Sequence, residues 1–300
     1  RLTGAYFCPD HFAGVMEIGL CLSLGILLAR DTAWRRKAFA AVLAMAALVI
    51  VVLSKSRGGG LTVLVVAAAV LAWGFPQWPP RARVGWRIAA VSLVALVLLV
   101  FGSVATAYVT RFKQHFGAAQ MQGKSWAEKR AVLAEALRGS CRGRMYAAAL
   151  RAWRTRPVLG IGPGMHQNLW PHFAPSPDGD REKGVWPSMP NYDFHSYEAH
   201  SDWLQLLEEY GALGLLLLLA PVTLLFGALL AGLRREESRW KRNDWRGRSS
   251  PSTALVMGAF LAGVAMAFHS FGDFNLQMPA TVWLLASVVA LALAEVLRSR

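Results

Sequence analysis

The segment His195–Leu219, HSYEAHSDWLQLLEEYGALGLLLLL, joins a cluster of titratable side chains to a run of leucines. The leucines belong to an apolar stretch, about residues 203–232, that is long enough to cross a bilayer, which takes roughly 20 residues of helix. Backbone groups in lipid must be hydrogen-bonded within their own segment, so the stretch is predicted to be helical. Hydrophobic residues make up 55% of the 300-residue chain and gather in further runs of this kind.

These runs predict an all-α, polytopic membrane helix bundle. About seven runs qualify as spans, at about 12–29, 38–53, 59–75, 88–108, 203–232, 254–271 and 280–297. A membrane β-barrel would show alternating apolar and polar residues, which these runs lack. We expect one integrated membrane domain, with helices in 1–108, a large loop at 109–202 and helices in 203–300. Because the chain opens without Met, we also expect further helices before Arg1.

The positive charge indicates membrane orientation rather than nucleic-acid binding. The formal net charge is +14, and basic residues gather in alternate short connections, around 30–37, 81–87 and 234–248. The positive-inside rule places these connections in the cytoplasm. Residues 54–60, 109–202 and 270–279 then face outward. The long loop is also basic, but long loops cross the membrane largely regardless of charge.

The large outer loop is predicted to have two parts. Residues 125–156 are amphipathic and are predicted to be helical, whereas residues 157–195 are rich in Pro and Gly and are predicted to be mostly loop. A long connection of this kind usually has a function. The three cysteines indicate neither a disulfide framework nor a zinc site, and a Cys8–Cys141 bridge stays open.

The connection SKSRGGG at residues 54–60 places Arg57 beside three glycines. The flanking apolar runs are short, so we expect this connection near the outer membrane interface. Arg57 either reaches lipid phosphate there or belongs to an anion site, since guanidinium groups bind phosphate oxygens in pairs. The glycines would let the backbone approach a ligand. They are not a P-loop, because no GxxxxGK[ST] pattern follows.

A second basic segment, RMYAAALRAWRTRPVLGIGPG, covers residues 144–164. Arg144, Arg151 and Arg154 belong to one helical segment that Pro157 ends, and a solvated basic face is its ordinary interpretation. The glycines of GIGPG predict a tight turn. Their spacing and context do not fit a dinucleotide-binding fingerprint.

The polar cluster before the leucines has three interpretations. His195, Glu198, His200 and Asp202 fit no zinc pattern, so a metal site is disfavoured. Ser201 and Asp202 look like a helix N-cap, and Asp202 followed by Gln205 resembles a capping box. His200, predicted at the outer membrane surface, suits a general base acting on a lipid-linked substrate.

The connection between the last two spans, FHSFGDFNLQMPA at residues 268–280, contains two ionisable side chains, His269 and Asp273. They would form an orienting or capping pair, or the connection is an ordinary turn.

Four outward segments, in this order and around one long loop, resemble the O-antigen ligase family, which also contains O-antigen polymerases and related glycan transferases. The segments are RLTGAYFCPDHFAG, SKSRGGG, RMYAAALRAWRTRPVLGIGPG and AHSDWLQLLEEYGALG. The resemblance covers nearly the whole chain, which corresponds to the later part of the family's fold, and SRGG and AHSDWLQLLEEYG are its most specific parts. Two departures are Ser201–Asp202, where the family often has Asn and an aromatic residue, and Asp10, where it usually has Asn.

The resemblance implies a bacterial inner-membrane glycosyltransferase whose active site faces the periplasm. Such enzymes take a glycan from a polyprenyl-pyrophosphate donor; ligases pass it to the lipid A core, and polymerases pass it to another lipid-linked glycan. By resemblance, Arg57 and Arg144 would bind the donor pyrophosphate and His200 would take the proton of the attacking hydroxyl. His195, His269 and Asp273 would be supporting residues. Neither a cofactor nor a nucleic-acid partner is expected.

Ligase and polymerase are not separated by these residues, since both need pyrophosphate binding and a base. A transporter would carry charged residues deep in its spans. Glu17, near the outer end of the first span, is the main exception to nearly apolar spans. Transport is therefore disfavoured.

Overall fold

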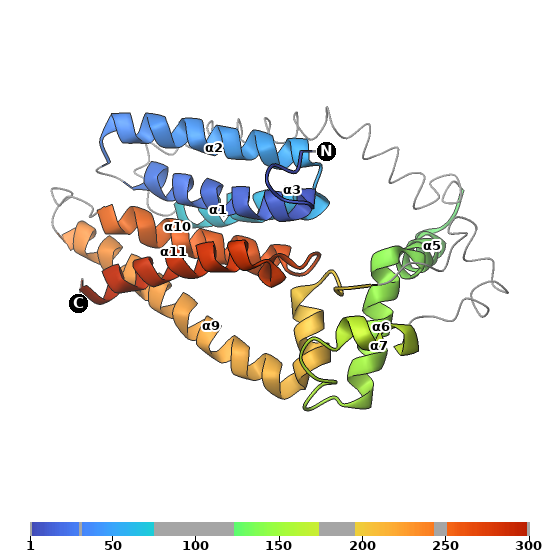
Figure 1. Ribbon diagram of the computed structural model, residues 1–300. Helices are drawn as coiled ribbons and strands as arrows, with labels where there is room; N and C mark the ends of the chain where they lie inside the picture. The colour runs from blue at the N-terminus through green and yellow to red at the C-terminus, as the bar shows by residue number, and fades with distance from the viewer. Residues whose placement is uncertain (1, 30–31, 75–122, 174–195, 243–250, 299–300) are drawn as a thin grey trace. The chain divides into compact units, whose positions relative to one another are not determined.

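A computed structural model describes residues 2–29, 32–74, 123–173, 196–242 and 251–298. Every element within these ranges is helical, which confirms the all-α prediction for this part of the chain (Figure 1). The elements are α1 Pro9–Leu28, α2 Trp34–Ser54, α3 Arg57–Gly74, α5 Trp126–Gly139, α6 Cys141–Thr155, α7 His166–Phe173, α9 Asp202–Arg242, α10 Pro251–His269, the 3₁₀ turn η3 Asn275–Gln277, and α11 Pro279–Arg298.

Several helices are suited to cross a membrane. Four of those described are long and apolar enough by length and composition, namely α1, α2, the Asp202–Ser238 part of α9, and α11. Two shorter apolar helices, Arg57–Ala72 and Thr253–His269, correspond to α3 and α10. The predicted run at 88–108 lies outside the described residues. The protein is therefore a polytopic helical membrane protein, and the count of seven spans stays a prediction.

The chain divides into two compact units. The membrane unit comprises Arg1–Val100 and Leu219–Arg300, and the loop unit comprises Phe101–Leu218. Helix α9 is continuous in the sequence across the boundary between them.

The membrane unit is built around α1 and α10. Helix α1 contacts α2, α3, α10 and α11, and α10 also contacts α3 and α11. Helices α1 and α10 approach closely at two glycines, because a Cβ added to Gly25 would lie 2.7 Å from the backbone nitrogen of Gly258. Small residues permit such close helix packing in membranes. Between the helices lies an apolar core that includes Ile18, Val66 and Leu261.

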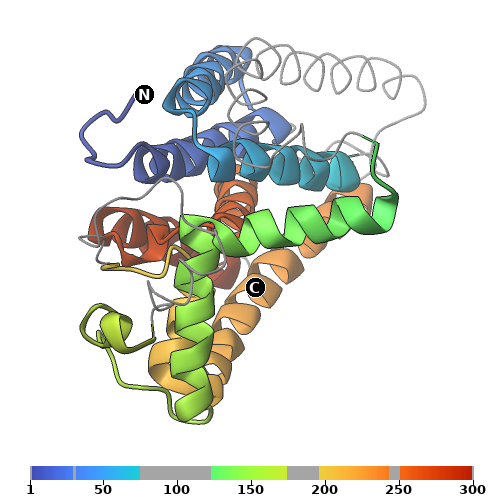
Figure 2. The ribbon, with the colours of Figure 1, turned by 90° about the vertical axis from the view of Figure 1, so that its right-hand side faces the viewer.

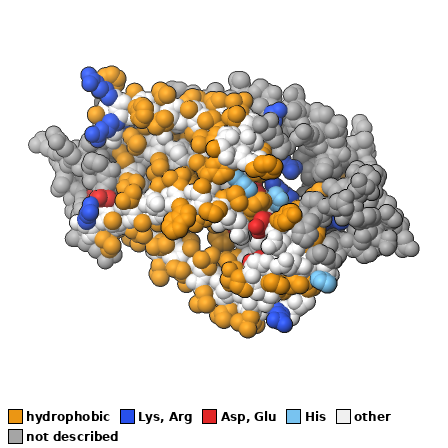
Figure 3. All heavy atoms as spheres, in the orientation of Figure 1, with side chains coloured by type: hydrophobic (Ala, Val, Ile, Leu, Met, Phe, Trp, Pro, Cys, Tyr) orange, Lys and Arg blue, Asp and Glu red, His pale blue; other side chains and the backbone are white. Residues whose placement is uncertain are grey.

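The surface of the membrane unit, around the outside of the helix bundle, is apolar as well. Large hydrophobic side chains are exposed along its helices, among them Leu53, Leu61, Trp283 and Leu291. Hydrophobic side chains cover much of the described surface in Figure 3. An apolar surface of this extent is what a lipid-facing bundle presents.

Residues 125–156 of the loop unit, predicted to be helical and amphipathic, form two helices, α5 and α6. Helix α5 begins with a capping box, in which the backbone nitrogen of Ser125 donates to Glu128 Oε2 at 2.7 Å and that of Glu128 donates to Ser125 Oγ at 3.4 Å. Ser140 then caps α6 by accepting a hydrogen bond from the backbone nitrogen of Gly143 at 3.0 Å. Helix α5 ends at Gly139, and Ser140 caps the start of α6. The predicted helical stretch 125–156 is therefore divided at these two residues (Figure 2).

Helix α9 is interrupted near its beginning. Gly211 has non-helical backbone angles, φ 67° and ψ −173°. Residues 157–162, which lead into the GIGPG turn, fill the interruption with backbone hydrogen bonds. The bonds run from Ile161 N to Glu208 O (3.0 Å), Gly162 N to Glu209 O (2.9 Å), Ala212 N to Pro157 O (2.9 Å) and Leu213 N to Val158 O (3.1 Å). The GIGPG segment is therefore fixed to the start of α9.

Candidate functional site

His200 lies immediately before α9 in an unusual backbone conformation. Its φ of 53° is in the left-handed region, which residues other than glycine rarely adopt. Its side chain is half-buried. Its carbonyl oxygen accepts a hydrogen bond from the hydroxyl of Tyr146, on α6, at 2.9 Å. A strained residue of this kind persists where its surroundings fix it, and such residues cluster at functional sites.

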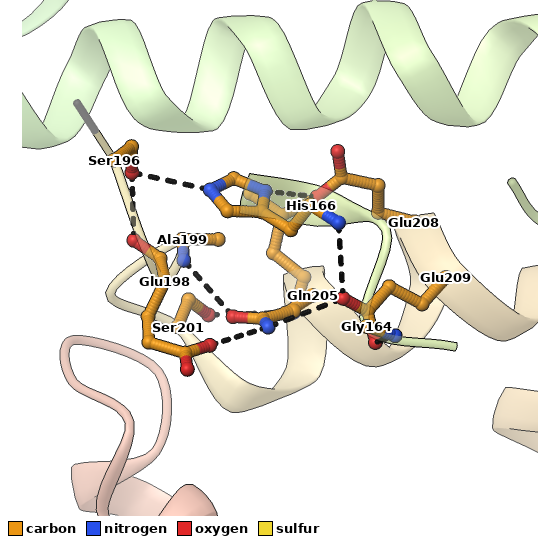
Figure 4. A network of polar contacts seen from close by, with 10 residues as sticks. Gly164, His166, Ser196, Glu198, Ala199, Ser201, Gln205, Glu208 and Glu209 are labelled. Atoms are coloured by element: carbon orange, nitrogen blue, oxygen red, sulfur yellow. Dashed lines mark hydrogen bonds and ion pairs between the residues drawn. The ribbon is translucent and has the colours of Figure 1, made fainter. Parts of the chain in front are cut away.

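A network of polar contacts fixes the segment before His200 (Figure 4). The hydroxyl of Ser196 donates to the carbonyl oxygen of Glu198 at 2.9 Å. The backbone nitrogen of Ala199 donates to Oε1 of Gln205 at 2.9 Å. The amide nitrogen of Gln205 donates to the carboxylates of Glu198 and Glu209. One buried glutamine thereby joins the loop to the first turns of α9.

The cap of α9 lies within the predicted pair, Ser201 and Asp202, but the predicted capping box of Asp202 with Gln205 does not form. In the structure Asp202 is the first helical residue, and Ser201 caps α9 by accepting from the backbone nitrogen of Leu204 at 3.4 Å. Gln205 turns its carbonyl oxygen toward Ala199 instead. The left-handed turn at His200 brings the backbone of Ala199 within reach of that side chain.

His166, the first residue of α7, lies at the centre of the network. Its ring is 1% exposed, with Nδ1 2.7 Å from Glu208 Oε2 and Nε2 3.1 Å from Ser196 Oγ. This order of groups resembles a Ser–His–Glu triad. The Ser196 hydroxyl has one proton and two acceptors within reach, the carbonyl oxygen of Glu198 at 2.9 Å and Nε2 of His166 at 3.1 Å. Because Ser196 is 1% exposed and its hydroxyl bonds to the Glu198 carbonyl oxygen, we assign it a structural role.

The side chain of Glu209, on α9, contacts the beginning of α7. Its carboxylate accepts from the backbone nitrogens of Gly164 at 2.9 Å and His166 at 3.2 Å. Gly160, Ile161 and Gly162 donate their backbone N–H groups to protein carbonyl oxygens. These donors of the GIGPG turn are thus used within the protein, and the turn serves as a structural joint.

Burial raises the pKa of the Glu198 carboxyl, and the hydrogen bond from Gln205 opposes that rise. The carboxylate of Glu209 also raises the pKa of Glu198 through charge repulsion. Glu198 lies two residues from His200 and is half-buried. The pre-helix segment therefore contains a carboxyl group that takes up a proton more readily than an exposed glutamate.

Arg144 is on α6, next to the buried Met145, and is half-buried itself. Of the other arginines on this helix, Arg151 donates to the carbonyl oxygen of Phe173 at 3.2 Å, and Arg154 is exposed. Tyr146 belongs to the same turn of α6 as Arg144. The structure therefore ties the helix that bears Arg144 to the backbone of His200.

Arg57 is the first residue of α3, in the membrane unit, and its side chain is exposed. The turn before it is tight, since Lys55 has a φ of 57° and caps α2. Ser56 caps α3 by accepting from the backbone nitrogen of Gly59 at 3.0 Å. Ser54 Oγ in turn accepts from the backbone nitrogen of Ser56 at 3.2 Å. The SKSR segment thus fixes the backbone from which the Arg57 side chain extends.

His269, the last residue of α10, is buried in the same unit. Its Nδ1 lies 2.9 Å and 3.0 Å from the two carboxylate oxygens of Glu17, on α1. The ring's hydrogen bonds go to Glu17 and not to Asp273, with which a pair was one of two predicted arrangements. Asp273 is also buried, and its Oδ1 accepts from the backbone nitrogen of Phe274 at 3.0 Å. His195 lies outside the described residues, and Cys8 and Cys141 are free thiols.

The family model described as O-antigen ligase matches residues 40–219. The chain belongs to the O-antigen ligase family. No curated protein matches the chain. The matched range contains Arg57, Arg144 and His200, as well as His166, which the sequence analysis did not single out. Members of this family are membrane enzymes that transfer glycans, ligases and polymerases alike, and their substrates are lipid-linked glycans.

The residues that fix the segment around His200 in this member of the O-antigen ligase family were not predicted from the sequence. His166 is 34 positions before His200 in the numbering, and Glu208 and Glu209 lie within the stretch predicted to be a membrane span. One feature of the sequence could have indicated these contacts. The first turns of the helix contain three polar residues that prove to be buried, Gln205, Glu208 and Glu209, before the helix becomes apolar. Buried polar groups require partners, so such a stripe predicts a packed polar neighbour.

Proposed function

We propose that the protein is an O-antigen ligase that transfers a glycan from a polyprenyl-pyrophosphate donor to a hydroxyl of the lipid A core or a similar acceptor. The observation that supports this most is the fixed, left-handed His200 at the start of α9, tied through Tyr146 to the helix that bears Arg144. A base must be held in one position to meet an acceptor hydroxyl. The reaction would take place on the periplasmic face of the bacterial inner membrane.

In the proposed mechanism His200 accepts the proton of the acceptor hydroxyl. The acceptor oxygen forms a bond to the anomeric carbon of the donor glycan, and the bond from that carbon to the pyrophosphate oxygen breaks. Polyprenyl pyrophosphate leaves as an anion and needs no proton from an acid. General-base catalysis of this kind typically contributes about 10²–10⁴-fold.

Arg57 and Arg144 bind the donor pyrophosphate in this proposal. Guanidinium groups match phosphate oxygens in paired hydrogen bonds and keep their charge at any physiological pH. Positive groups aimed at charge that develops on a leaving group are usually the largest contribution to catalysis. Asp273, His269 and His195 would have supporting roles.

Product analysis tests the proposal. Purified full-length protein is incubated with a polyprenyl-pyrophosphate glycan and a lipid A-core acceptor from the native host, with His200→Ala as the control. Glycan on the core, lost in the control, is the expected result. Longer polyprenyl-linked glycans would instead identify a polymerase. No transfer from intact donor would contradict both assignments.

A further inference from the structure

We infer that Glu17 and His269 form a buried pair that positions Arg57, because Gly58 and Gly59 of the SRGG motif rest directly on it. The inference concerns the membrane unit alone, where α1, α3 and α10 contact one another. It rests on the proposed role of Arg57 in binding the donor pyrophosphate.

The pair consists of two ionisable side chains inside the helix bundle. Glu17 is on the candidate span α1, and His269 ends the apolar helix α10; each residue is 1% exposed. The hydrogen bonds from Nδ1 to both oxygens of Glu17 offset the cost of burying them. Ionisable residues within membrane helices are costly and usually functional. The proposed catalytic steps make no use of this pair, so its function has to be indirect.

Gly58 lies against the ring of His269. A Cβ added to Gly58 would be 2.7 Å from Nε2 and 2.9 Å from Cδ2 of that ring. Nε2 is buried and has no hydrogen-bond partner in the described part of the chain, so Nδ1 alone anchors the ring. The ring edge therefore serves as a surface on which the α3 backbone rests.

Gly59 lies against the other member of the pair. A Cβ added there would be 3.1 Å from Oε1 of Glu17 and 3.2 Å from Cβ of Ala13. Glu17 thus brings a carboxyl group to the first turn of α3. A carboxylate near a helix N-terminus is favourable, because the unpaired N–H groups there carry partial positive charge.

These contacts explain the order of residues in SRGG. Ser56 caps α3, Arg57 extends outward, and the two glycines face inward onto the buried pair. Movement of the ring or the carboxylate would move the first turn of α3 and the origin of the Arg57 side chain with it. Since misplacement of a binding group by about 1 Å can cost about 100-fold in rate, the pair would control how the donor is held.

The test compares two polar replacements of His269. The amide nitrogen of Asn lies at the position of Nδ1, whereas that of Gln reaches toward Nε2. We expect each of three variants to raise the KM for the polyprenyl-pyrophosphate glycan about 10-fold or more. His269→Asn keeps the hydrogen bond to Glu17 but removes the ring edge under Gly58, whereas His269→Gln and Glu17→Leu remove the hydrogen bond itself. The KM for the acceptor should stay unchanged. Ser23→Ala is the matched control, because Ser23 is buried on α1 and its hydroxyl donates to the carbonyl oxygen of Gly19 within the same helix at 2.9 Å.

Thermal unfolding in detergent separates positioning from folding. If Glu17→Leu does not fold, the two polar variants His269→Asn and His269→Gln, compared with wild type, still decide. Equal donor KM values for these two variants and wild type, with Arg57→Ala raising that KM, would overturn the inference alone. An unchanged donor KM in Arg57→Ala would instead overturn the proposed donor site.

Discussion

Gly160 and Gly211 pack backbone against backbone, and neither position has room for a side chain. A Cβ on Gly160 would lie 2.6 Å from the backbone nitrogen of Gly211, and a Cβ on Gly211 would lie 2.5 Å from that of Gly160. Both residues have positive φ, 73° and 67°. The contact joins the GIGPG turn to the interruption in α9, and thereby joins α6 and α7 to the helix that follows His200.

Substitution at this contact should destabilise the protein. Gly160→Ala is expected to cost about 2–5 kcal/mol, since a left-handed residue other than glycine costs about 1–2 and overpacking adds about 1–3. The measurement is the unfolding temperature of purified protein in detergent. Gly227→Ala is the matched control, because Gly227 lies in α9 with no atom within 4 Å of the added Cβ. A loss in the control as large as in Gly160→Ala would show that the close contact is not the cause.

The structural assignment of Ser196 gives a second prediction. Ser196→Ala should retain glycan transfer within about 10-fold of wild type, because its loss removes buried hydrogen bonds worth about 1–3 kcal/mol and no bond-forming atom. The rate of transfer at saturating donor is the readout. A loss as complete as that of His200→Ala would mean that Ser196 acts as a nucleophile after all.

A third prediction concerns pH and Glu198. Burial raises the pKa of this carboxyl above its ordinary value of 4.5, so the folded protein binds the proton more tightly than the unfolded chain does. Stability therefore falls as pH rises from the ordinary value through the raised one. Glu198→Gln keeps an oxygen that can accept from Gln205 and removes the titration. We expect the variant's unfolding temperature, relative to wild type, to increase from about pH 4 to about pH 7.

Glu128 provides a control of opposite sign. It is fully exposed, and its hydrogen bonds with Ser125 lower the pKa of its carboxyl. The capping box is therefore favoured above the ordinary pKa and lost as pH falls through the lowered one. Glu128→Gln should be less stable than wild type at neutral pH, with the difference fading in acid. The same pH trend in both variants would contradict the assignment for Glu198.

The helices could be predicted from the sequence because long apolar runs leave the backbone no other solution in lipid. The S-x-x-E pattern of Ser125 and Glu128 was also a readable start signal for α5. The interruption at Gly211 was not readable, since a single glycine in an apolar helix is often tolerated. Only the approach of Gly160 from another segment gives it meaning.

The polar partners of the histidines could not be predicted from the sequence either, because they are far from them along the chain. Glu17 and His269 are 252 positions apart, and no local spacing relates them. His166 likewise meets Glu208 only after α7 and α9 have packed. Arg57, Arg144 and His200 could be nominated because their chemistry suits pyrophosphate and proton transfer. The groups that hold them in place are determined by tertiary contacts.

A fourth prediction tests the donor site. Arg57→Lys keeps the positive charge but not the planar fork, and should lose most of the transfer activity. Lys55→Arg, on the same turn and also exposed, is the matched control and should behave as wild type. Near-wild-type transfer by Arg57→Lys would remove Arg57 from the site.

The central claim, that His200 is the base, is tested most directly by His200→Gly in a single-turnover transfer assay. Glycine accepts the left-handed backbone without strain, so the fold and the unfolding temperature should be kept. The account predicts that the transfer rate at saturating donor and acceptor falls by about 10²–10⁴-fold. A folded His200→Gly protein that transfers glycan at the wild-type rate would contradict it.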